Sequence, residues 1–327
     1  MKRRAVLGAI TLATASVMGL TSVSTAFAAD TFPSRPITVI VPYAVGGSAD
    51  LITRLVTTGM SAKGTSTVVD NRTGGGGVVG WNVAARANPD GYTLLTTEMS
   101  YAIAATLQPK LPFDPKKGFR HIAVVASVPH VLVVNPGVPA KTVQEFIALA
   151  KANPGKYYYG SGGNGTNTHL GGALFNSVAG VNLVHVPYRG AGAALQDVMG
   201  GQIQALITSL PTALPYIKSG KLRALMLAND VRSPVLPDVP AAPEVGMPKM
   251  VMKYWVAFSA PAGTPQPVID TLNKDIVAAV NAPEVKRQLQ AQGLDPEGST
   301  PAQATKLVDD EIRRWAAVIK AANIKAD

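Results

Sequence analysis

One segment near the start of the chain places a strand, a glycine turn and the beginning of a helix in direct succession. Ile37–Val41 is rich in β-branched residues, which predicts a buried strand that ends at Pro42. Gly46 and Gly47 follow, and an amphipathic run from Ser48 predicts a helix. The first N–H groups of a helix lack partners inside it, and glycine lets a ligand approach the backbone. This succession predicts an α/β fold with an anion site at the turn.

A second turn of the same kind lies about halfway along the chain. A short aromatic strand is predicted at residues 157–159 and a helix at residues 169–179. Between them, residues 161–166 read Ser-Gly-Gly-Asn-Gly-Thr and supply hydroxyl and amide donors around glycines. We expect the two turns to face each other and to capture a carboxylate, because both offer donors to an anion.

Strands and helices alternate along most of the chain, which predicts mixed, mostly parallel sheets in an α/β architecture. The further strands are predicted at residues 67–70, 92–97, 121–127, 131–134, 183–186, 205–207, 224–227 and 255–260, and the further helices at residues 50–60, 78–87, 142–152 and 191–199 and in two or three segments that end near Ala322. Residues 109–118 are predicted to be a loop.

Two runs of alternating strands and helices predict two lobes. The runs are joined near residues 127–129 and again near residues 253–255, which predicts two crossings between the lobes. We expect lobe 1 to contain residues 29–128 and 255–327, and lobe 2 to contain residues 129–254. The glycine turns would then meet in the cleft between the lobes, where the carboxyl ends of the strands also lie.

The first 28 residues have the pattern of a secretory signal peptide. Lys2-Arg3-Arg4 is the charged region, residues 5–17 are apolar, and Ala26-Phe27-Ala28 predicts cleavage before Ala29. The pair Arg3-Arg4 is also compatible with a twin-arginine signal. A transmembrane anchor is disfavoured, because the apolar stretch is short and interrupted by Thr and Ser. The mature chain is therefore expected to be exported.

Composition argues against several kinds of site. The chain has no cysteine, and its four histidines are dispersed, so we expect no metal site and no cofactor. Without Lys2, Arg3 and Arg4, the 30 basic residues become 27 against 20 acidic ones, a net charge of +7. Because no cluster of five or more basic residues is present, no nucleic-acid partner is expected. A mildly positive field favours small anions.

Two catalytic or nucleotide-binding alternatives have weak support. Residues 74–77 are four glycines, but they lack the Gly-Lys-Ser/Thr ending of a phosphate loop. Ser161 lies near His169 in sequence, but the chain has no Gly-x-Ser-x-Gly elbow. We expect a protein that is not an enzyme, and a secreted hydrolase stays the less favoured alternative.

Seven phrases, in order, resemble those of one family. They are residues 42–50 (PYAVGGSAD), 70–77 (DNRTGGGG), 89–95 (PDGYTLL), 159–170 (YGSGGNGTNTHL), 185–190 (HVPYRG), 220–225 (GKLRAL) and 236–240 (LPDVP). Across essentially the whole mature chain, this series resembles the Bug (TctC-like) periplasmic receptors of tripartite tricarboxylate transporters. The resemblance implies a two-lobed Venus-flytrap fold in the periplasm that closes on a small carboxylate.

The resemblance also implies partners. These are the membrane permease subunits of the transporter, with a sensor-kinase ectodomain as an alternative, and the protein is expected to be a monomer.

Gln204 and Thr208 stand where many members of the family carry acidic residues. A ligand ammonium group would lose a partner there, which favours an aliphatic or aromatic acid without an amino group.

The predicted ligand contacts come mainly from the two turns and from strand ends. Asp50 is expected to be a helix cap or a first-turn acid rather than a ligand contact, because its charge would repel a carboxylate. Ser48 and His169 also have purely structural alternatives, an N-cap and a structural hydrogen bond. Two roles stay open for Arg189: pairing with a distal carboxylate of the ligand, or a solvated or inter-lobe role. Ser100 is a second candidate contact near Thr97. The predicted contacts are Tyr43, Gly46, Gly47, Ser48, Thr97, Ser161, Gly162, Asn164, Gly165, Thr166, His169 and Thr208.

Overall fold

A computed structural model describes residues 32–108, 110–321 and 324–325. The residues from Phe32 onward form one compact unit. The expected signal peptide at residues 1–28 lies outside the described residues. No helix in the described ranges has the length and apolar character needed to cross a membrane. Within the same ranges, no three acidic or histidine side chains are grouped so that they could hold a metal ion.

The core of the fold is a continuous sheet in the order β2-β1-β3-β9-β4-β7-β5-β6, with β8 and β10 also paired to β4. The strands are β1 (Ile37–Val41), β2 (Thr67–Asn71), β3 (Thr93–Glu98), β4 (Phe119–Val134), β5 (Tyr158–Ser161), β6 (Val184–Pro187), β7 (Ala205–Ser209), β8 (Arg223–Ala228), β9 (Lys253–Pro261) and β10 (Asp295–Pro296).

The sheet is mixed, as predicted, but parallel pairings do not predominate. Among the described strands, β1 pairs in parallel with β2 and β3, and β5 with β6 and β7. The other five pairings are antiparallel and all involve β4 or β9. The crossover units that the alternating pattern predicted are therefore present, and the two long strands join them with the opposite pairing.

Ten α-helices surround the sheet in the described part of the chain. They are α1 (Ser48–Ser61), α2 (Val78–Ala85), α3 (Met99–Leu107), α4 (Val143–Ala152), α5 (Asn167–Ala179), α6 (Ala191–Met199), α7 (Leu210–Lys218), α8 (Gln266–Val280), α9 (Pro283–Ala291) and α10 (Pro301–Ala321). Helices α3 and α7 were not predicted. Short 3-10 helices are η1 (Gly75–Gly77), η2 (Ala242–Val245) and η3 (Pro248–Met250).

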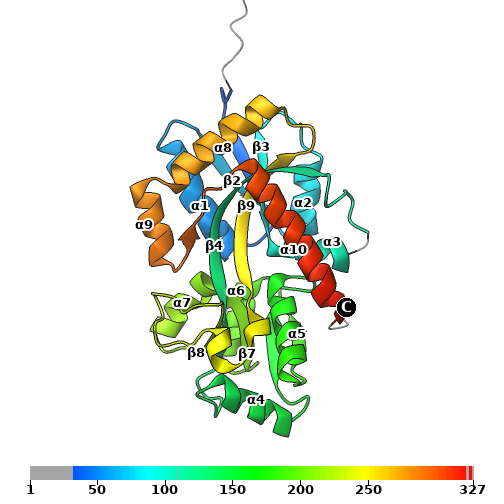
Figure 1. The fold of residues 1–327 in the computed structure, drawn as a ribbon, viewed down its shortest axis with the longest axis vertical. Helices are drawn as coiled ribbons and strands as arrows, with labels where there is room; N and C mark the ends of the chain where they lie inside the picture. The colour runs from blue at the N-terminus through cyan, green and yellow to red at the C-terminus, as the bar shows by residue number, and fades with distance from the viewer. Residues whose placement is uncertain (1–31, 109, 322–323, 326–327) are drawn as a thin grey trace, which may run out of the picture. The chain divides into compact units, whose positions relative to one another are not determined.

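Strands β4 and β9 run side by side through the centre of the molecule (Figure 1). β4 is one strand of 16 residues, where two strands on either side of Pro129 were predicted. Its partner is β9 from Phe119 to Pro129, and from His130 onward its partners are β7 and β8. The change of partners falls between Pro129 and His130, and Lys253 of β9 lies opposite Pro129.

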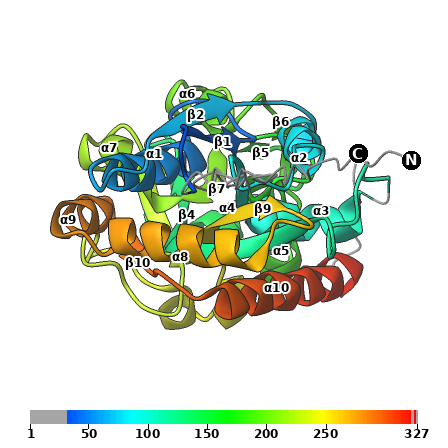
Figure 2. The same cartoon turned by 90° about the horizontal axis from the view of Figure 1, so that it is seen from above.

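Helices α8 and α10 pack on β4, and in the view of Figure 2 they lie below β4 and β9, whereas β1 and β2 lie above these strands. Helix α1 forms because its apolar side chains recur with helical spacing, and Ile52, Val56 and Met60 are all fully buried. In the group of elements around β5 and β7, the Phe175 ring of α5 stacks on Phe146 with centroids 6.1 Å apart.

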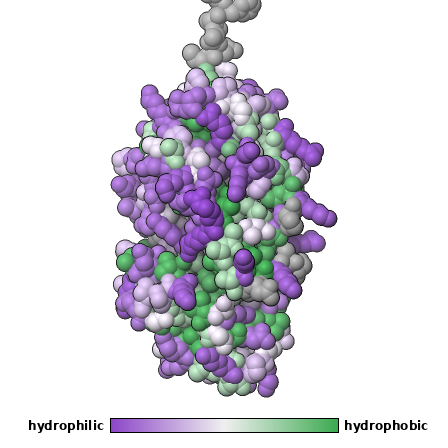
Figure 3. Space-filling model, turned by 45° about the vertical axis from the view of Figure 1, so that its right-hand side comes forward, coloured by the Kyte–Doolittle hydropathy of each residue, from purple (hydrophilic) through white to green (hydrophobic). Residues whose placement is uncertain are grey.

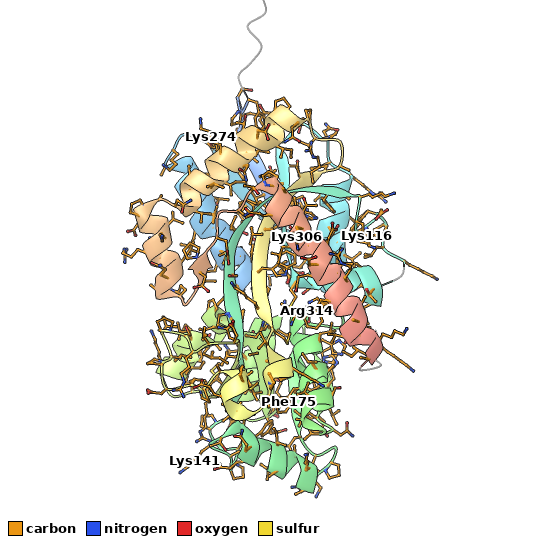
Figure 4. The ribbon with its side chains drawn as sticks, viewed as in Figure 1. Lys116, Lys141, Phe175, Lys274, Lys306 and Arg314 are labelled. Atoms are coloured by element: carbon orange, nitrogen blue, oxygen red, sulfur yellow. The ribbon has the colours of Figure 1, made fainter. Side chains whose placement is uncertain are left out.

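Charged side chains project outward from the helices. In Figure 4, Lys274, Lys306 and Arg314 extend from α8 and α10, whereas Phe175 lies inside the fold. The face drawn in Figure 3 is mostly hydrophilic in its upper part, and hydrophobic residues gather in its lower half.

Candidate functional site

A cavity of about 480 Å³ brings the two predicted turns together. Its lining contains seven of the predicted contacts: Tyr43, Gly46, Gly47, Ser48, Gly162, Thr166 and Thr208. The volume lies in the range of sites that hold small organic molecules.

The starts of several helices converge on this cavity. Ser48 and Ala49 of α1, Asn167 and Thr168 of α5, and Ala191 of α6 all line it. The lining also includes residues at the starts of α3 and α7. No side chain caps the N-terminus of α1, α6 or α7, so donors at these ends are not used by a cap. The arrangement favours an anion, because helix N-termini carry partial positive charge.

The turn after β1 is shaped by Asp50. Its carboxylate accepts hydrogen bonds from the Gly46 N–H at 3.0 Å, from Arg54 Nε at 3.0 Å and from Asn71 Nδ2 at 3.0 Å. Burial alone would raise the pKa of Asp50, but these hydrogen bonds lower it below its ordinary value. Asp50 therefore holds the turn as an acid in the first turn of α1, which is one of its two predicted roles; it is not the helix cap, because the N-cap is Gly47. The Gly46 N–H is occupied, and Gly46 serves the turn through its positive φ of 85°.

Three hydroxyl groups meet at the start of α1. Ser48 Oγ lies 2.5 Å from Ser209 Oγ and 2.8 Å from Thr212 Oγ1, and the latter two atoms are 3.1 Å apart. Ser209 ends β7, and Thr212 is in the first turn of α7. The cluster therefore ties the first predicted turn to the segment that carries Thr208.

Thr208 has a buried hydroxyl group on the cavity wall. The residue is 1% exposed, and its Oγ1 has no hydrogen-bond partner among the described residues. An unpartnered buried hydroxyl costs about 1–3 kcal/mol. Such a cost is offset when a bound polar ligand supplies the partner, which makes Thr208 the clearest single sign of a ligand in this cavity.

A buried carboxylate, Glu98, lies behind the cavity and was not found from the sequence. It is fully buried and accepts hydrogen bonds from Tyr43 Oη, from the Ser100 N–H at 2.8 Å and from Asn167 Nδ2 at 3.1 Å. Burial raises the pKa of Glu98, although the three hydrogen bonds oppose the rise. Burial and the nearby carboxylate of Glu98 both raise the pKa of the Tyr43 hydroxyl.

Asn167 links this carboxylate to the second predicted turn. Its N–H donates to Ser100 Oγ at 3.0 Å, and its Oδ1 lies 3.1 Å from His130 Nε2. Glu98 caps α3, Asn167 begins α5, and His130 belongs to β4. Three segments that are distant in sequence are therefore joined under the cavity by one buried polar network.

The structure places five predicted contacts outside the cavity lining: Thr97, Ser161, Asn164, Gly165 and His169. The Thr97 hydroxyl is bonded within the sheet, to Ala257 O at 3.1 Å and to Ser259 Oγ at 2.7 Å. Thr97 is fully buried. Its neighbour Ser100, the second candidate at this strand end, does line the cavity.

Ser161 and His169 support the second turn from behind. Ser161 Oγ lies 2.6 Å from His185 Nε2 and donates to Gly163 O at 3.2 Å. The Gly165 N–H donates to His169 Nδ1 at 3.2 Å, and the His169 and His185 rings stack with centroids 4.1 Å apart. These contacts fix the shape of the turn that carries Gly162 and Thr166.

A third strand–glycine–helix turn also faces the cavity. Strand β6 ends at Pro187, Gly190 precedes α6, and Arg189 and Gln196 are part of the lining. The pattern is the one that identified the first two turns. The sequence singled out Arg189 here, but the turn itself was not predicted as an anion site, because Gly190 stands alone. Other lining residues outside the predicted contacts are Ala44, Val45, Ala49, Ser100, Asn167, Thr168, Ala191, Gly192, Ala193, Ser209, Thr212, Tyr216 and Tyr254.

Solved periplasmic proteins have similar folds. One described as a periplasmic transporter matches with a TM-score of 0.88 at 42% identity, covering 90% of this chain and 100% of that chain. A protein of R. palustris solved with adipate matches with a TM-score of 0.86 at 31% identity, over 90% of this chain and 99% of its own. MatC from Rhodopseudomonas palustris, solved with bound malate, matches with a TM-score of 0.84 at 33% identity, covering 88% of this chain and 100% of MatC. The predicted periplasmic-binding-protein fold is confirmed.

Sequence comparison points to the same family. BugT of Bordetella pertussis is 38% identical over 300 residues, which are 91% of this chain and 92% of BugT. Residues 52–324 match the model of the TctC family, described as the tripartite tricarboxylate transporter family receptor. The predicted resemblance is thus confirmed, and the chain belongs to the TctC family of tripartite tricarboxylate transporter receptors.

Proposed function

We propose that the chain is a periplasmic receptor that captures a small carboxylate in this cavity and presents it to the permease subunits of a tripartite tricarboxylate-type transporter. The observation that carries the proposal is the unpartnered Thr208 hydroxyl in a cavity at which uncapped helix N-termini converge. No acidic side chain is among the lining residues. An anion is favoured in such a site, and an ammonium group would find no carboxylate partner.

Relatives support the choice of ligand class. The similar proteins solved with adipate and with malate hold organic acids. Neither acid carries an amino group, in keeping with the lining of this cavity.

We propose that two lobes close on the ligand. One lobe contains residues 29–128 and 255–327, and the other contains residues 129–254. The hydroxyl cluster of Ser48, Ser209 and Thr212 and the link from Glu98 to Asn167 both join these two groups of residues. A ligand that contacts both groups stabilises the closed arrangement, because its affinity for that arrangement is higher.

Binding is favoured over hydrolysis by the position of Ser161. Its hydroxyl is fully buried, lies outside the cavity lining and is bonded to the turn that it supports. A nucleophile must reach the substrate, so the short contact with His185 is assigned a structural role.

The first prediction is a ligand-dependent rise in melting temperature. The mature protein, from Ala29 onward, is screened against aliphatic and aromatic carboxylates at neutral pH, and its own acid raises Tm by several degrees because binding stabilises the folded state. Mass spectrometry of the denatured preparation identifies any acid carried through purification. A flat response and no calorimetric heat, from a preparation shown to be empty, would contradict the proposal.

The second prediction concerns Thr208→Val, which replaces the hydroxyl by a methyl group of similar size. We expect about a tenfold loss of carboxylate affinity, because the ligand loses a hydrogen bond. The free energy of unfolding of the empty protein should rise by about 1 kcal/mol, because a buried unpartnered hydroxyl is removed.

Thr97→Val is the matched control for this experiment. The Thr97 hydroxyl is bonded within the sheet, so its loss should lower stability by about 1 kcal/mol and leave affinity unchanged. Equal carboxylate affinities for Thr208→Val and the wild type would show that the Thr208 hydroxyl does not bind the ligand.

A further inference from the structure

The run of four glycines, Gly74–Gly77, has a backbone that glycine adopts more readily than any other residue. Its φ values are 135°, 58°, 66° and 116°, in the region where residues with a Cβ are rare. Gly75–Gly77 form η1, and Gly77 leads directly into α2. All four residues lie outside the lining of the cavity. Direct contact with a ligand therefore does not account for the run.

One side of the run rests on aromatic side chains of its own proposed lobe. A Cβ built on Gly77 would lie 2.6 Å from the Trp81 ring and 3.0 Å from Tyr43 Oη, so both groups pack directly against the glycine backbone. Trp81 is fully buried, and its ring meets the Tyr101 ring edge-on with centroids 5.6 Å apart. Packing this close leaves the run little freedom to move relative to these residues. The run thus presents a fixed backbone surface.

The other side of the run meets the second turn, which belongs to the other proposed lobe. A Cβ built on Gly76 would lie 2.9 Å from the main-chain oxygen of Asn164 and 4.0 Å from Thr166 Cγ2. The first distance is shorter than a real Cβ tolerates, so the turn can come this close only because Gly76 has no side chain. Thr166 itself lines the cavity. The contact therefore lies at the edge of the cavity, between the two proposed lobes.

The neighbouring residue Gly75 shows what is particular to Gly76. The two have nearly the same φ, 58° and 66°, so each needs glycine equally for its backbone. A Cβ on Gly75 would meet Val78 Cβ at 3.3 Å, in its own segment, and Val78 provides all the atoms found within 4 Å of it. Of these two glycines, only Gly76 touches the second turn.

We propose that Gly76 is a positioning residue for closure: the Asn164 carbonyl docks on the glycine run, and the missing side chain lets the two lobes close over the bound acid. The inference rests on the proposed function, from which it takes the closure of the lobes on a carboxylate. A methyl group at Gly76 would hold the second turn away from the first. Affinity for the acid would then fall without a change in any ligand contact, because it scales with the population of the closed state.

Calorimetric titration of Gly76→Ala and Gly75→Ala tests this role. The probe is the tightest-binding acid from a panel of malate, succinate, adipate and benzoate, and the mature protein is first shown by mass spectrometry to be empty. Both variants place a methyl group at a left-handed φ, so both should lower the Tm of the empty protein by similar amounts. Gly76→Ala should lose about tenfold or more in affinity, and Gly75→Ala should stay within about twofold of the wild type.

Small-angle X-ray scattering gives a readout that a merely structural role would not change. With saturating acid, the radius of gyration of the wild type and of Gly75→Ala should decrease, because the closed state becomes dominant. At saturating acid, Gly76→Ala should show a smaller decrease, because the methyl group opposes the approach of Asn164.

A second pair of variants approaches the same contact from the other side. Gly165 has a φ of 76°, and its Cβ would lie 3.1 Å from Gln108 Nε2, at the end of α3. Gly155 has a φ of 73° with open space around its Cβ position, so Gly155→Ala is the control for Gly165→Ala. We expect about a threefold lower affinity for Gly165→Ala than for this control, since the Gln108 side chain can partly move aside. This pair decides the question if Gly76→Ala does not fold.

The outcomes separate this inference from the proposed function. Equal affinity and equal compaction for Gly76→Ala and Gly75→Ala would overturn the role of Gly76 while the receptor function stood. If Gly76→Ala does not fold, equal affinities for Gly165→Ala and Gly155→Ala would do the same. A panel without any binding to the empty wild type would overturn both.

Discussion

Glu98→Ala should lower the free energy of unfolding by about 3 kcal/mol or more, because it leaves three buried donors without an acceptor. Tyr43 Oη, the Ser100 N–H and Asn167 Nδ2 all converge on this carboxylate, which is fully buried. Urea unfolding at neutral pH measures the change, which should move the midpoint and leave the slope unaltered. A loss below about 1 kcal/mol would show that the network contributes little to stability.

Glu98→Gln separates the charge of this group from its hydrogen bonds. Burial raises the pKa of Glu98 in the folded state, so just above the ordinary value this group binds protons more strongly in the folded protein than in the unfolded chain. In the window above the ordinary value of 4.5, wild-type stability therefore falls as pH rises. The amide does not titrate, so the stability of Glu98→Gln relative to the wild type should increase as the pH rises above 4.5. A constant difference would contradict the assignment of the raised pKa.

The elements predicted well were those whose pattern is local. The succession of β1, its glycine turn and α1 was found because β-branched spacing, glycine and helical periodicity all lie within about 25 residues. Helix α4 was found because Thr142 caps it, and Thr142 Oγ1 accepts the Glu145 N–H at 3.1 Å as predicted. Such signals need no knowledge of what packs around them.

The elements that were missed lack a local signal. Helix α3 is buried on most of its surface, including Met99, Tyr101 and Ile103, so its sequence has no polar face to mark a period. Helix α7 contains Pro211 and Pro215, which predict a break rather than a helix. Strand β4 continues through Pro129, which also predicted a break.

The candidate site shows the same division. The two turns carrying Ser48 and Gly162 were identified, because a strand–glycine–helix succession can be recognised in one stretch of sequence. The Glu98 network could not be identified from the sequence, because its members lie on β3, on the first turn and on α5. Only the tertiary fold brings them together. Glu98 also stands among buried residues where a carboxylate is not expected.

Acidification should destabilise the protein through His121. This histidine is buried on β4, with Nδ1 2.8 Å from Ser259 Oγ, and burial lowers its pKa to about 4. The unfolded chain has the ordinary value of 6.5, so it binds more protons than the folded protein between about pH 6.5 and pH 4. Stability is fully present above this window. Going from pH 7 to pH 5 should remove about 2 kcal/mol, approaching about 3 kcal/mol near pH 4.

The His121→Asn variant isolates this contribution, because asparagine places a polar atom near the former Nδ1 and does not titrate. Glu98 acts in the opposite direction over part of the same range, since its raised pKa favours the folded state as pH falls. The comparison must therefore be made between variant and wild type at each pH rather than on the wild type alone. Urea unfolding at pH 7, 6 and 5 should show the wild type losing about 2 kcal/mol more than His121→Asn across the series. Parallel curves for the two proteins would mean that His121 is not held neutral by its buried position.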